Sequence, residues 1–145
     1  MAGPLYNRDI LRLAASIPYL ARLDGAQASS ERRAPLCGSR VIVDIVLDEA
    51  GRVAAIGQEV KACALGQASA ALMGNSVIGR SAIELVAARD ALAAFLTGER
   101  CDPGHWPGIE ALAVARDYPA RHGAILLPFE AVAEAASAAR RKQAA

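Results

Sequence analysis

The spacing of apolar and polar residues in the first third of the chain predicts a helix followed by an irregular segment. Over residues 7–23, apolar residues recur at mixed helical spacing, which predicts a short amphipathic helix that Pro18 ends or kinks. Residues 24–33 are small and polar, so they predict a connector into an extended segment at residues 34–38. Cys37 is therefore expected at a strand end or in a turn.

The middle of the chain predicts an antiparallel hairpin. Residues 41–47 are rich in β-branched side chains, and every second position is apolar, as in a strand with one buried face. The sequence Asp-Glu-Ala-Gly at 48–51 predicts a hairpin turn, and residues 53–61 predict the returning strand.

Two helices are predicted after the hairpin. The small residues 64–73 predict a helix that stops at residues 74–75, Gly-Asn. Ser81 is placed to cap a second helix that runs to Leu96, with Glu84 completing a capping box. We expect these two helices to cover one face of the sheet.

The last third of the chain predicts a loop and two more helices. Residues 98–108 form a loop in which Trp106 is expected to be a core anchor, and residues 109–115 a short helix. Residues 124–141 predict an amphipathic helix that Pro128 interrupts early. Helix, strands and then helices in this order predict an α+β fold.

Length, charge and hydropathy exclude several classes of protein. A chain of 145 residues predicts a single domain over residues 1–145. Sixteen Lys and Arg against 15 Asp and Glu leave a net charge of +1, which argues against a nucleic-acid partner. Charged residues interrupt every apolar stretch before about 18 residues, and the N-terminus lacks a secretory pattern. We therefore expect a cytoplasmic protein without a membrane partner.

The three cysteines are the residues best suited to chemistry. An odd number argues against a disulfide framework and leaves metal binding, sulfur chemistry or burial. Cys63 stands where the predicted strand passes into a helix, and the positive end of a helix favours a thiolate. Its alternative role is that of a small buried apolar residue. Cys37 precedes Gly38, which allows close approach of the backbone to a bound atom.

Several stretches of the sequence resemble one known family. They are residues 34–38 (APLCG), 62–73 (ACALGQASAALM), 118–121 (YPAR) and 127–131 (LPFEA). They resemble the U-type iron–sulfur cluster assembly scaffolds, which include IscU, SufU and the N-terminal domain of NifU. Residues 106–112 look more like the SufU branch. The resemblance implies an α+β fold in which a small antiparallel sheet of about three strands packs against several helices.

The resemblance also implies a ligand set, which this chain matches only in part. In the family, three cysteines hold a metal or a nascent cluster, and an aspartate lies two residues after the first cysteine. Cys37 and Cys63 match the first two cysteines. Ser39 stands at the aspartate position, and Ala124 stands at the third cysteine position. An iron–sulfur cluster and zinc therefore both stay open as cofactors.

A second alignment of the third ligand is also open. If His122 is matched to the His-Cys pair of the IscU branch, the third cysteine position is Gly123. With either alignment, His122 could add an imidazole to Cys37 and Cys63, giving three protein ligands and a water in the fourth place. The alternative for His122 is a solvated surface histidine.

Two further residues are candidates for lesser roles. Arg121 matches the basic residue that precedes the family's third cysteine, so the resemblance makes it a candidate for stabilising persulfide or sulfide charge. Its alternative is a solvated arginine. Cys101 lies near Asp102 and His105, but the family motif does not use this loop, and we expect an exposed or half-buried bystander.

The function implied by the resemblance is not enzymatic. It is that of an iron–sulfur cluster assembly scaffold or sulfur acceptor, which receives persulfide sulfur from a cysteine desulfurase and works with other cluster-assembly proteins. Because Ser39 and Ala124 replace ligands, the alternative is a degenerate member that binds the machinery without holding a cluster. A thiol-dependent enzyme using Cys63 and His122 lacks a visible third group to orient the base. A homodimer is also open.

Overall fold

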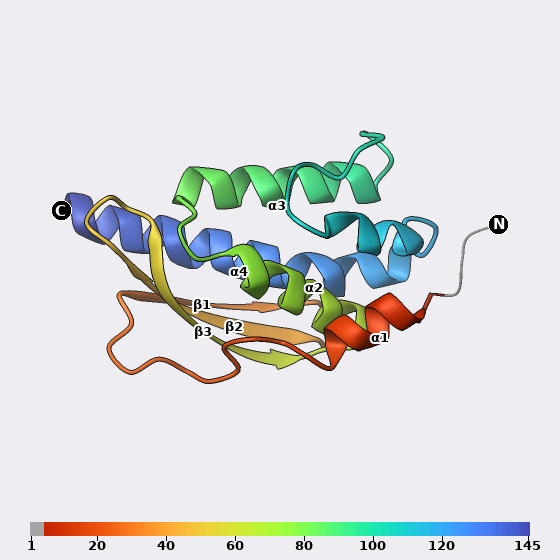
Figure 1. Cartoon of the computed structure of the whole chain (residues 1–145), viewed down its shortest axis with the longest axis horizontal. Coiled ribbons are helices and arrows are strands. Elements are labelled where there is room, and N and C mark those ends of the chain that lie inside the picture. Colours follow the sequence, from red (N-terminus) through yellow and green to blue (C-terminus); the bar gives the residue numbers. More distant parts are fainter. Residues whose placement is uncertain (1–4) are drawn as a thin grey trace.

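A three-stranded antiparallel sheet carries helices on one face (Figure 1). The computed structural model describes residues 5–145. The expected α+β class is confirmed. In chain order the elements are α1 (Arg8–Ala14), β1 (Ala28–Arg33), β2 (Arg40–Leu47), β3 (Val53–Lys61), α2 (Ala64–Ser76), α3 (Ala82–Leu96), the 3₁₀ helix η1 (Ile109–Ala115) and α4 (Pro119–Ala144).

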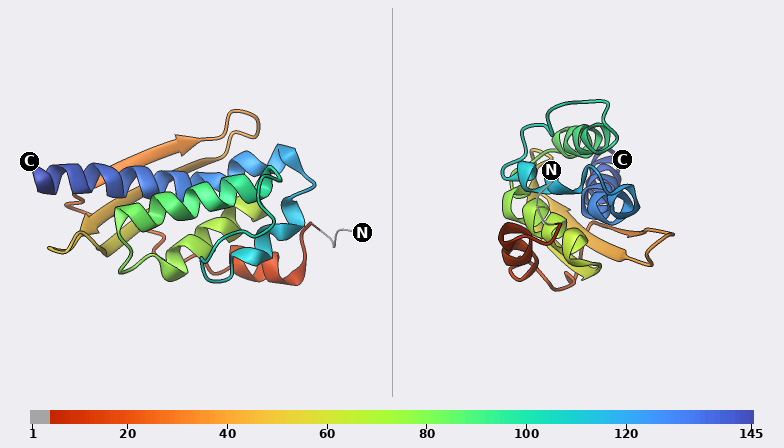
Figure 2. Two further views of the ribbon diagram at one scale, coloured as in Figure 1. Left: turned by 90° about the horizontal axis from the view of Figure 1, so that it is seen from above. Right: turned by 90° about the vertical axis from the view of Figure 1, so that its right-hand side faces the viewer.

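The helices form two layers above the sheet (Figure 2). The long helix α4 lies across β1 and β2, and α2 packs beside α4 with α1 against it. Helix α3 packs on α4 on the side away from the sheet. The expectation that α2 and α3 together cover the sheet was therefore wrong for α3, because α4 occupies that place.

The register of the strands brings the two cysteine-bearing segments to one end of the sheet. Strand β2 pairs with β1 and β3 so that Arg40, at its start, lies opposite Arg33 and Lys61. The segment before Arg40, residues 34–39, is named the cysteine turn and contains Cys37. Cys63 follows β3 by two residues. Because β2 and β3 are antiparallel, the start of β2 lies beside the end of β3. Both cysteines therefore lie at the same end of the sheet.

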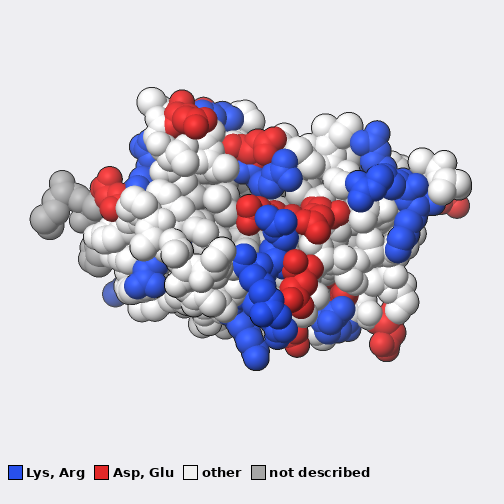
Figure 3. All heavy atoms as spheres, turned by 180° about the vertical axis from the view of Figure 1, so that it is seen from behind, with Lys and Arg blue, Asp and Glu red and all other residues white. Residues whose placement is uncertain are grey.

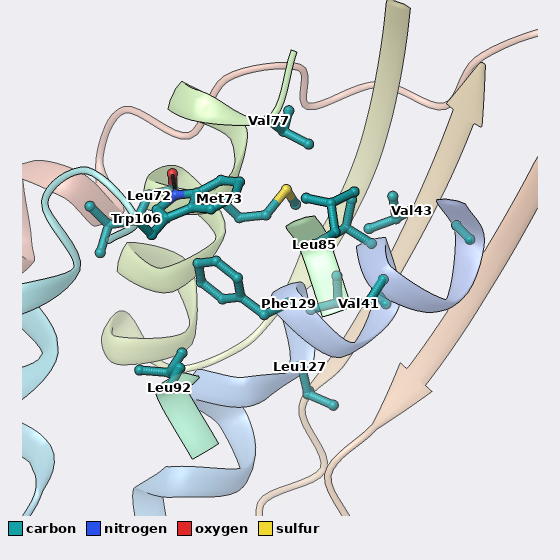
Figure 4. Packing of buried hydrophobic residues seen from close by; sticks show 14 of the residues in the cluster. Val41, Val43, Leu72, Met73, Val77, Leu85, Leu92, Trp106, Leu127 and Phe129 are labelled. Atoms are coloured by element: carbon teal, nitrogen blue, oxygen red, sulfur yellow. Dashed lines mark hydrogen bonds between the residues drawn. The ribbon is translucent and has the colours of Figure 1, made fainter. Parts of the chain in front are cut away.

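The core lies between the sheet and the helices, and Trp106 anchors the long loop in it (Figure 4). The indole Nε1 donates a hydrogen bond to the carbonyl oxygen of Leu72 at 2.7 Å. The ring meets Phe129 edge to face, with centroids 5.4 Å apart. The guanidinium of Arg80 lies over the indole ring of Trp106, 4.8 Å from its centroid. The sequence prediction for Trp106 is confirmed.

The N-terminal helix is shorter than predicted. It ends at Ala14, and residues 16–25 form an irregular strap that follows β3. Within the strap, the carbonyl oxygen of Tyr19 accepts a hydrogen bond from the backbone N–H of Gln58 at 2.9 Å. A Cβ on Gly57 would lie 2.2 Å from the carbonyl oxygen of Ala21, so this close approach requires glycine.

Strand β1 was not predicted, because its residues were interpreted as a connector. The segment pairs with β2 along its whole length and forms an edge of the sheet. Ala28 and Ser30 are buried on alternate positions. Two positions further, Arg32 makes an ion pair with Glu134 of α4 at 3.2 Å. Tertiary packing thus gives a polar segment its strand structure.

Helix boundaries elsewhere follow their local signals with three exceptions. Helix α2 continues past the predicted stop at residues 74–75 and ends at Ser76, because Gly74 serves close packing rather than a helix end: a Cβ on it would lie 2.7 Å from the Cγ of Pro18. Ser81 accepts from the N–H of Glu84 in the predicted capping box. Helix α4 begins at Pro119 rather than near residue 124, because proline is compatible with a first helical turn. It also continues through Pro128. Within residues 5–145, none of the helices combines the length and the apolar character that crossing a membrane requires.

Candidate functional site

The first turns of α4 touch both cysteine-bearing segments. A Cβ placed on Gly66, in the first turn of α2, would lie 3.2 Å from the carbonyl oxygen of Ala124 and 3.5 Å from its Cβ. A Cβ placed on Gly123 would lie 3.6 Å from the Cβ of Ala34 in the cysteine turn. Figure 2 shows the turn between β1 and β2 beside the beginning of α4. Cys37, Cys63 and the start of α4 therefore share one end of the molecule.

The contact between α2 and α4 is fixed by the backbone around Pro128. Proline has no N–H, so the carbonyl oxygen of Ala124 loses its helical donor four residues later. Gly66 lets α2 approach that carbonyl closely. Beside it, the hydroxyl of Ser69 donates a hydrogen bond to the carbonyl oxygen of Ile125. The start of α4 is thereby held against the helix that follows Cys63.

Cys37 is exposed in a turn that depends on glycine. Gly38 has φ +71, a conformation that glycine adopts without strain, and its N–H donates to the carbonyl oxygen of Ala34 at 3.0 Å. The Sγ of Cys37 is hydrogen-bonded to the Oγ of Ser39 at 3.0 Å. Hydrogen bonds from Ser39 lower the pKa of the Cys37 thiol, and the positive charge of Arg121 acts in the same direction. The thiolate fraction at neutral pH is therefore increased.

Cys63 is the N-cap residue of α2, as predicted. Its backbone is extended, with φ −66 and ψ 171, and its carbonyl oxygen accepts from the N–H of Gln67 at 2.9 Å. The side chain is half-buried and makes no capping hydrogen bond. The thiol is thus not committed to closing the helix end, and it stays available for chemistry.

The other residues of the implied ligand set have different surroundings. Ser39 is 5% exposed and directs its hydroxyl to Cys37, and Ala124 is 1% exposed. The Nε2 of His122 lies 2.8 Å from the carbonyl oxygen of Ala115. Among the residues that the structure describes, 5–145, no three His, Cys, Asp or Glu side chains are grouped closely enough to hold a metal ion. His122 is therefore not grouped with the two cysteines.

The donor set does not fit a four-coordinate zinc or iron site. Such sites take thiolate, imidazole or carboxylate ligands, and a neutral hydroxyl is a poor substitute. Cys37 and Cys63 supply two thiols, Ser39 supplies a hydroxyl and Ala124 supplies a methyl group. The metal chemistry of a complete family site cannot be carried over to these residues.

Asp102, which follows Cys101 in the long loop, has a structural role. The carboxylate of Asp102 accepts from the N–H of Gly104 at 2.7 Å and from the guanidinium of Arg100 at 3.2 Å. The Gly104 N–H and then Arg100 lower the pKa of Asp102. Cys101 itself is exposed, as expected. Asp102 therefore stabilises its own turn.

Acidic and basic side chains lie beside one another over the middle of one face of the molecule (Figure 3). On the face shown in Figure 3, basic groups lie next to acidic ones. On the sheet, Arg40 makes ion pairs with Glu59 at 3.5 Å and with Glu31 at 3.8 Å. Basic side chains also gather at the right of Figure 3, near the C-terminal end of the molecule, so the two kinds of charge are not evenly mixed over this face.

Comparison with known proteins relates the chain to cluster-assembly scaffolds. No model of a protein family matches it. It is 27% identical over 131 residues to the iron-sulfur cluster assembly scaffold protein IscU of Thermotoga maritima, covering 90% of this chain and 92% of that protein. A nitrogen-fixing NifU-like protein (N-terminal) from Brucella abortus is 38% identical in its crystal structure, with a TM-score of 0.89 and coverage of 95% and 96%.

A third protein shares the fold. The putative iron-sulfur cluster assembly scaffold protein for the SUF system from Fervidobacterium islandicum is 21% identical, with a TM-score of 0.83 over 91% of this chain and 96% of that one. The sheet, the long covering helix and the two cysteines at one end thus define a NifU-like scaffold fold. The chain belongs to the U-type family of iron–sulfur cluster assembly scaffolds, as its sequence stretches predicted.

Proposed function

We propose that this chain acts in iron–sulfur cluster assembly by accepting sulfur from a cysteine desulfurase on Cys37 and Cys63. The observation that carries the proposal is their shared location: the strand register brings an exposed and a half-buried thiol to one end of the chain. The identity to a NifU-like protein over nearly the whole chain supports the same role. The cluster is then the product of the machinery that this chain serves.

The transfer that we propose needs no external oxidant or reductant. The thiolate of Cys37 attacks the terminal sulfur of a persulfide on the desulfurase. A new S–S bond forms on Cys37 as the old one breaks, and the desulfurase cysteine leaves as a thiolate. No proton is gained or lost in this step, because the transferred terminal sulfur keeps the proton that it carried on the desulfurase. The Ser39 hydroxyl and Arg121 stabilise the negative charge at Cys37 before the attack.

We expect the cysteines at the shared end to account for sulfur acceptance. The chain is incubated with a cysteine desulfurase and L-cysteine, and mass spectrometry of its peptides locates the added sulfur. Cys37→Ala combined with Cys63→Ala should abolish the uptake at this end of the molecule, because no thiol is left there. The matched control is Cys101→Ala, which should keep full uptake. Equal total uptake by the double variant and the unmodified chain would contradict the proposal.

Leu36 provides a contact beside the reacting thiol. Its side chain is 90% exposed in the cysteine turn, directly before Cys37. Burying a leucine side chain contributes about 1.5–3 kcal/mol, so Leu36→Ala should weaken desulfurase binding roughly tenfold. Titration of the desulfurase by calorimetry measures the change. Ile83→Ala, which removes an exposed apolar side chain from α3, is the control. Unchanged affinity for Leu36→Ala would place the contact elsewhere.

The degenerate, docking-only member is the second candidate function. It is favoured by the incomplete donor set, because Ser39 and Ala124 supply neither a thiolate nor a carboxylate. The two candidates predict the same binding to the desulfurase and different chemistry. A chain that binds the desulfurase and gains no sulfur would have the docking role alone.

A further inference from the structure

We propose that this chain handles sulfur without a metal ion of its own, and that the Ser39 hydroxyl takes the place of a metal as the partner of Cys37. The inference rests on the proposed function, because sulfur acceptance is what gives the two thiols a use. It concerns this chain in particular, because Ser39 and Ala124 stand at two positions where a complete metal centre would have ligands.

The first argument is the number of donors. Zinc and iron in tetrahedral protein sites need four ligands, and a catalytic or open site still keeps three from the protein. Cys37 and Cys63 are joined by no third Cys, His, Asp or Glu in the part of the chain that the structure covers. The imidazole that the resemblance offered as a third ligand, that of His122, already has its Nε2 at the carbonyl oxygen of Ala115. Two thiols alone leave half of the coordination to water.

The second argument is the sign of the charge. Arg121 is the basic residue whose field acts on Cys37, and its charge has the same sign as a metal ion. A cation near a thiol attracts an anion. A persulfide or a thiolate is such an anion. The charge of Arg121 therefore helps to hold a thiolate or a persulfide anion at Cys37.

The third argument is the packing at the start of α4. The methyl group of Ala124 is 1% exposed and lies against Gly66 in the first turn of α2. This close contact occupies the space next to the helix that Cys63 caps. Position 124 therefore supplies no metal ligand, because its side chain is a methyl group and the space around it is already filled.

The position of Ser39 supports its role as a positioning residue. It is buried, and its carbonyl oxygen accepts from the N–H of Ala34 at 2.9 Å, which closes the cysteine turn. Its Oγ lies 3.0 Å from the Sγ of Cys37. The hydroxyl is therefore held in place before sulfur arrives, and it donates to Cys37 when the sulfur is ionised.

The test measures zinc retention and sulfur uptake on the full chain. Zinc is added and then withdrawn with a chelator, and the remaining ion is counted per chain. Separately, the metal-free chain is exposed to glutathione persulfide, and sulfur on each cysteine is followed by mass spectrometry. We expect the zinc to be lost and Cys37 to gain one sulfur. Cys101 in the same sample is the internal reference for an exposed thiol.

Variants of Ser39 separate positioning from structure. Ser39→Ala should slow sulfur uptake at Cys37 about tenfold, and Ser39→Thr should restore the rate because it keeps the hydroxyl. The control is Ser30→Ala, since Ser30 is also a buried serine and its Oγ has no hydrogen-bond partner. It should leave the rate unchanged. A wild-type rate in Ser39→Ala would overturn the positioning role.

The zinc assay decides the metal part of the proposal. Ser39→Asp with Ala124→Cys should retain zinc, because it adds a carboxylate and a thiolate. Ser39→Asp with Gly123→Cys tests the other alignment at an exposed position. The inference is overturned if the unmodified chain keeps one zinc per chain or one per two chains. Loss of zinc from both variants would overturn the argument that the missing donors at these positions are the cause. The proposed function fails separately, in the desulfurase assay.

Discussion

Replacing Phe129 by alanine is expected to lower the free energy of unfolding by about 3–5 kcal/mol. The side chain is fully buried in α4, at the centre of the cluster between the helices (Figure 4). It supports Trp106 through the edge-to-face contact, and Trp106 in turn fixes the long loop. The substitution therefore leaves a cavity and removes the partner of the largest aromatic side chain.

Urea unfolding followed by circular dichroism measures this loss. Phe129→Leu, which keeps much of the volume, should lose less than the alanine variant. Ile83→Ala removes an apolar side chain that is 65% exposed, and its effect should stay within about 0.5 kcal/mol. A loss below about 1 kcal/mol for Phe129→Ala would mean that the core closes around the missing ring.

Asp44→Asn is expected to cost about 3 kcal/mol at neutral pH. The carboxylate is completely buried in β2 and accepts from the Nε of Arg22 at 2.7 Å and from the N–H of Leu23 at 2.9 Å. The hydroxyl of Ser29 donates to it as well. These bonds attach the strap to the sheet. In Asp44→Asn, the NH2 group of the amide would face N–H and O–H groups that are themselves donors, so those hydrogen bonds would be lost.

The same residue gives the stability of the protein a pH dependence. Burial alone would raise the pKa of Asp44, but hydrogen bonds from Arg22, Ser29 and the Leu23 N–H outweigh burial and lower it. The stability that the ionised carboxylate contributes is therefore present above the ordinary aspartate value of about 3.9. It is lost as the pH falls through the lower pKa of the folded state.

Unfolding measured across this pH range tests the sign. The difference in stability between the unmodified chain and Asp44→Asn should be largest near neutral pH and should shrink below about pH 4. Ser81→Ala, which removes a helix cap away from this ion pair, supplies a destabilised control. A difference that grows as the pH falls would show that the buried carboxylate destabilises the fold.

Features encoded by neighbouring residues were predicted from the sequence. The capping box of Ser81 and Glu84 depends on residues three positions apart, and the hairpin depends on alternation within each strand. The anchor role of Trp106 follows from its rarity in an aromatic-poor chain. For the capping box and the hairpin both the signal and the structure are local. For Trp106 the sequence predicts only its burial, because its partners Leu72 and Phe129 lie far away along the chain.

Features that depend on distant partners were missed. The residues of β1 have little strand propensity, and only pairing with β2 and packing under α4 make them a strand. The strap was interpreted as helix because Ile17 and Leu20 continue the apolar spacing of α1. Its course is set by Asp44, which lies in another element. Such pairings leave no periodic pattern in the sequence.

The candidate site was partly predictable. The types and local settings of Cys37 and Cys63 followed from a glycine turn and a helix start. The bond between Cys37 and Ser39 was missed, although a serine next to a turn glycine is a recognisable signal for a side-chain hydrogen bond. The contact of His122 with the Ala115 carbonyl oxygen has no such signal, because every residue carries a carbonyl group.

The bulge in the β2–β3 hairpin determines where the chain tolerates insertions. Val46 pairs with Ala55 and Leu47 with Val53, so β3 has one extra residue near the turn. Between the bulge and the cysteines the register is continuous. The bulge can absorb an insertion at the tip of the hairpin. Between the bulge and Cys63, a register shift of two residues would keep every side chain on its face of the sheet but would move Cys63 by about 6.6 Å along the strand. Natural variation in length should therefore collect at the tip, while the segment leading to Cys63 keeps its residue count.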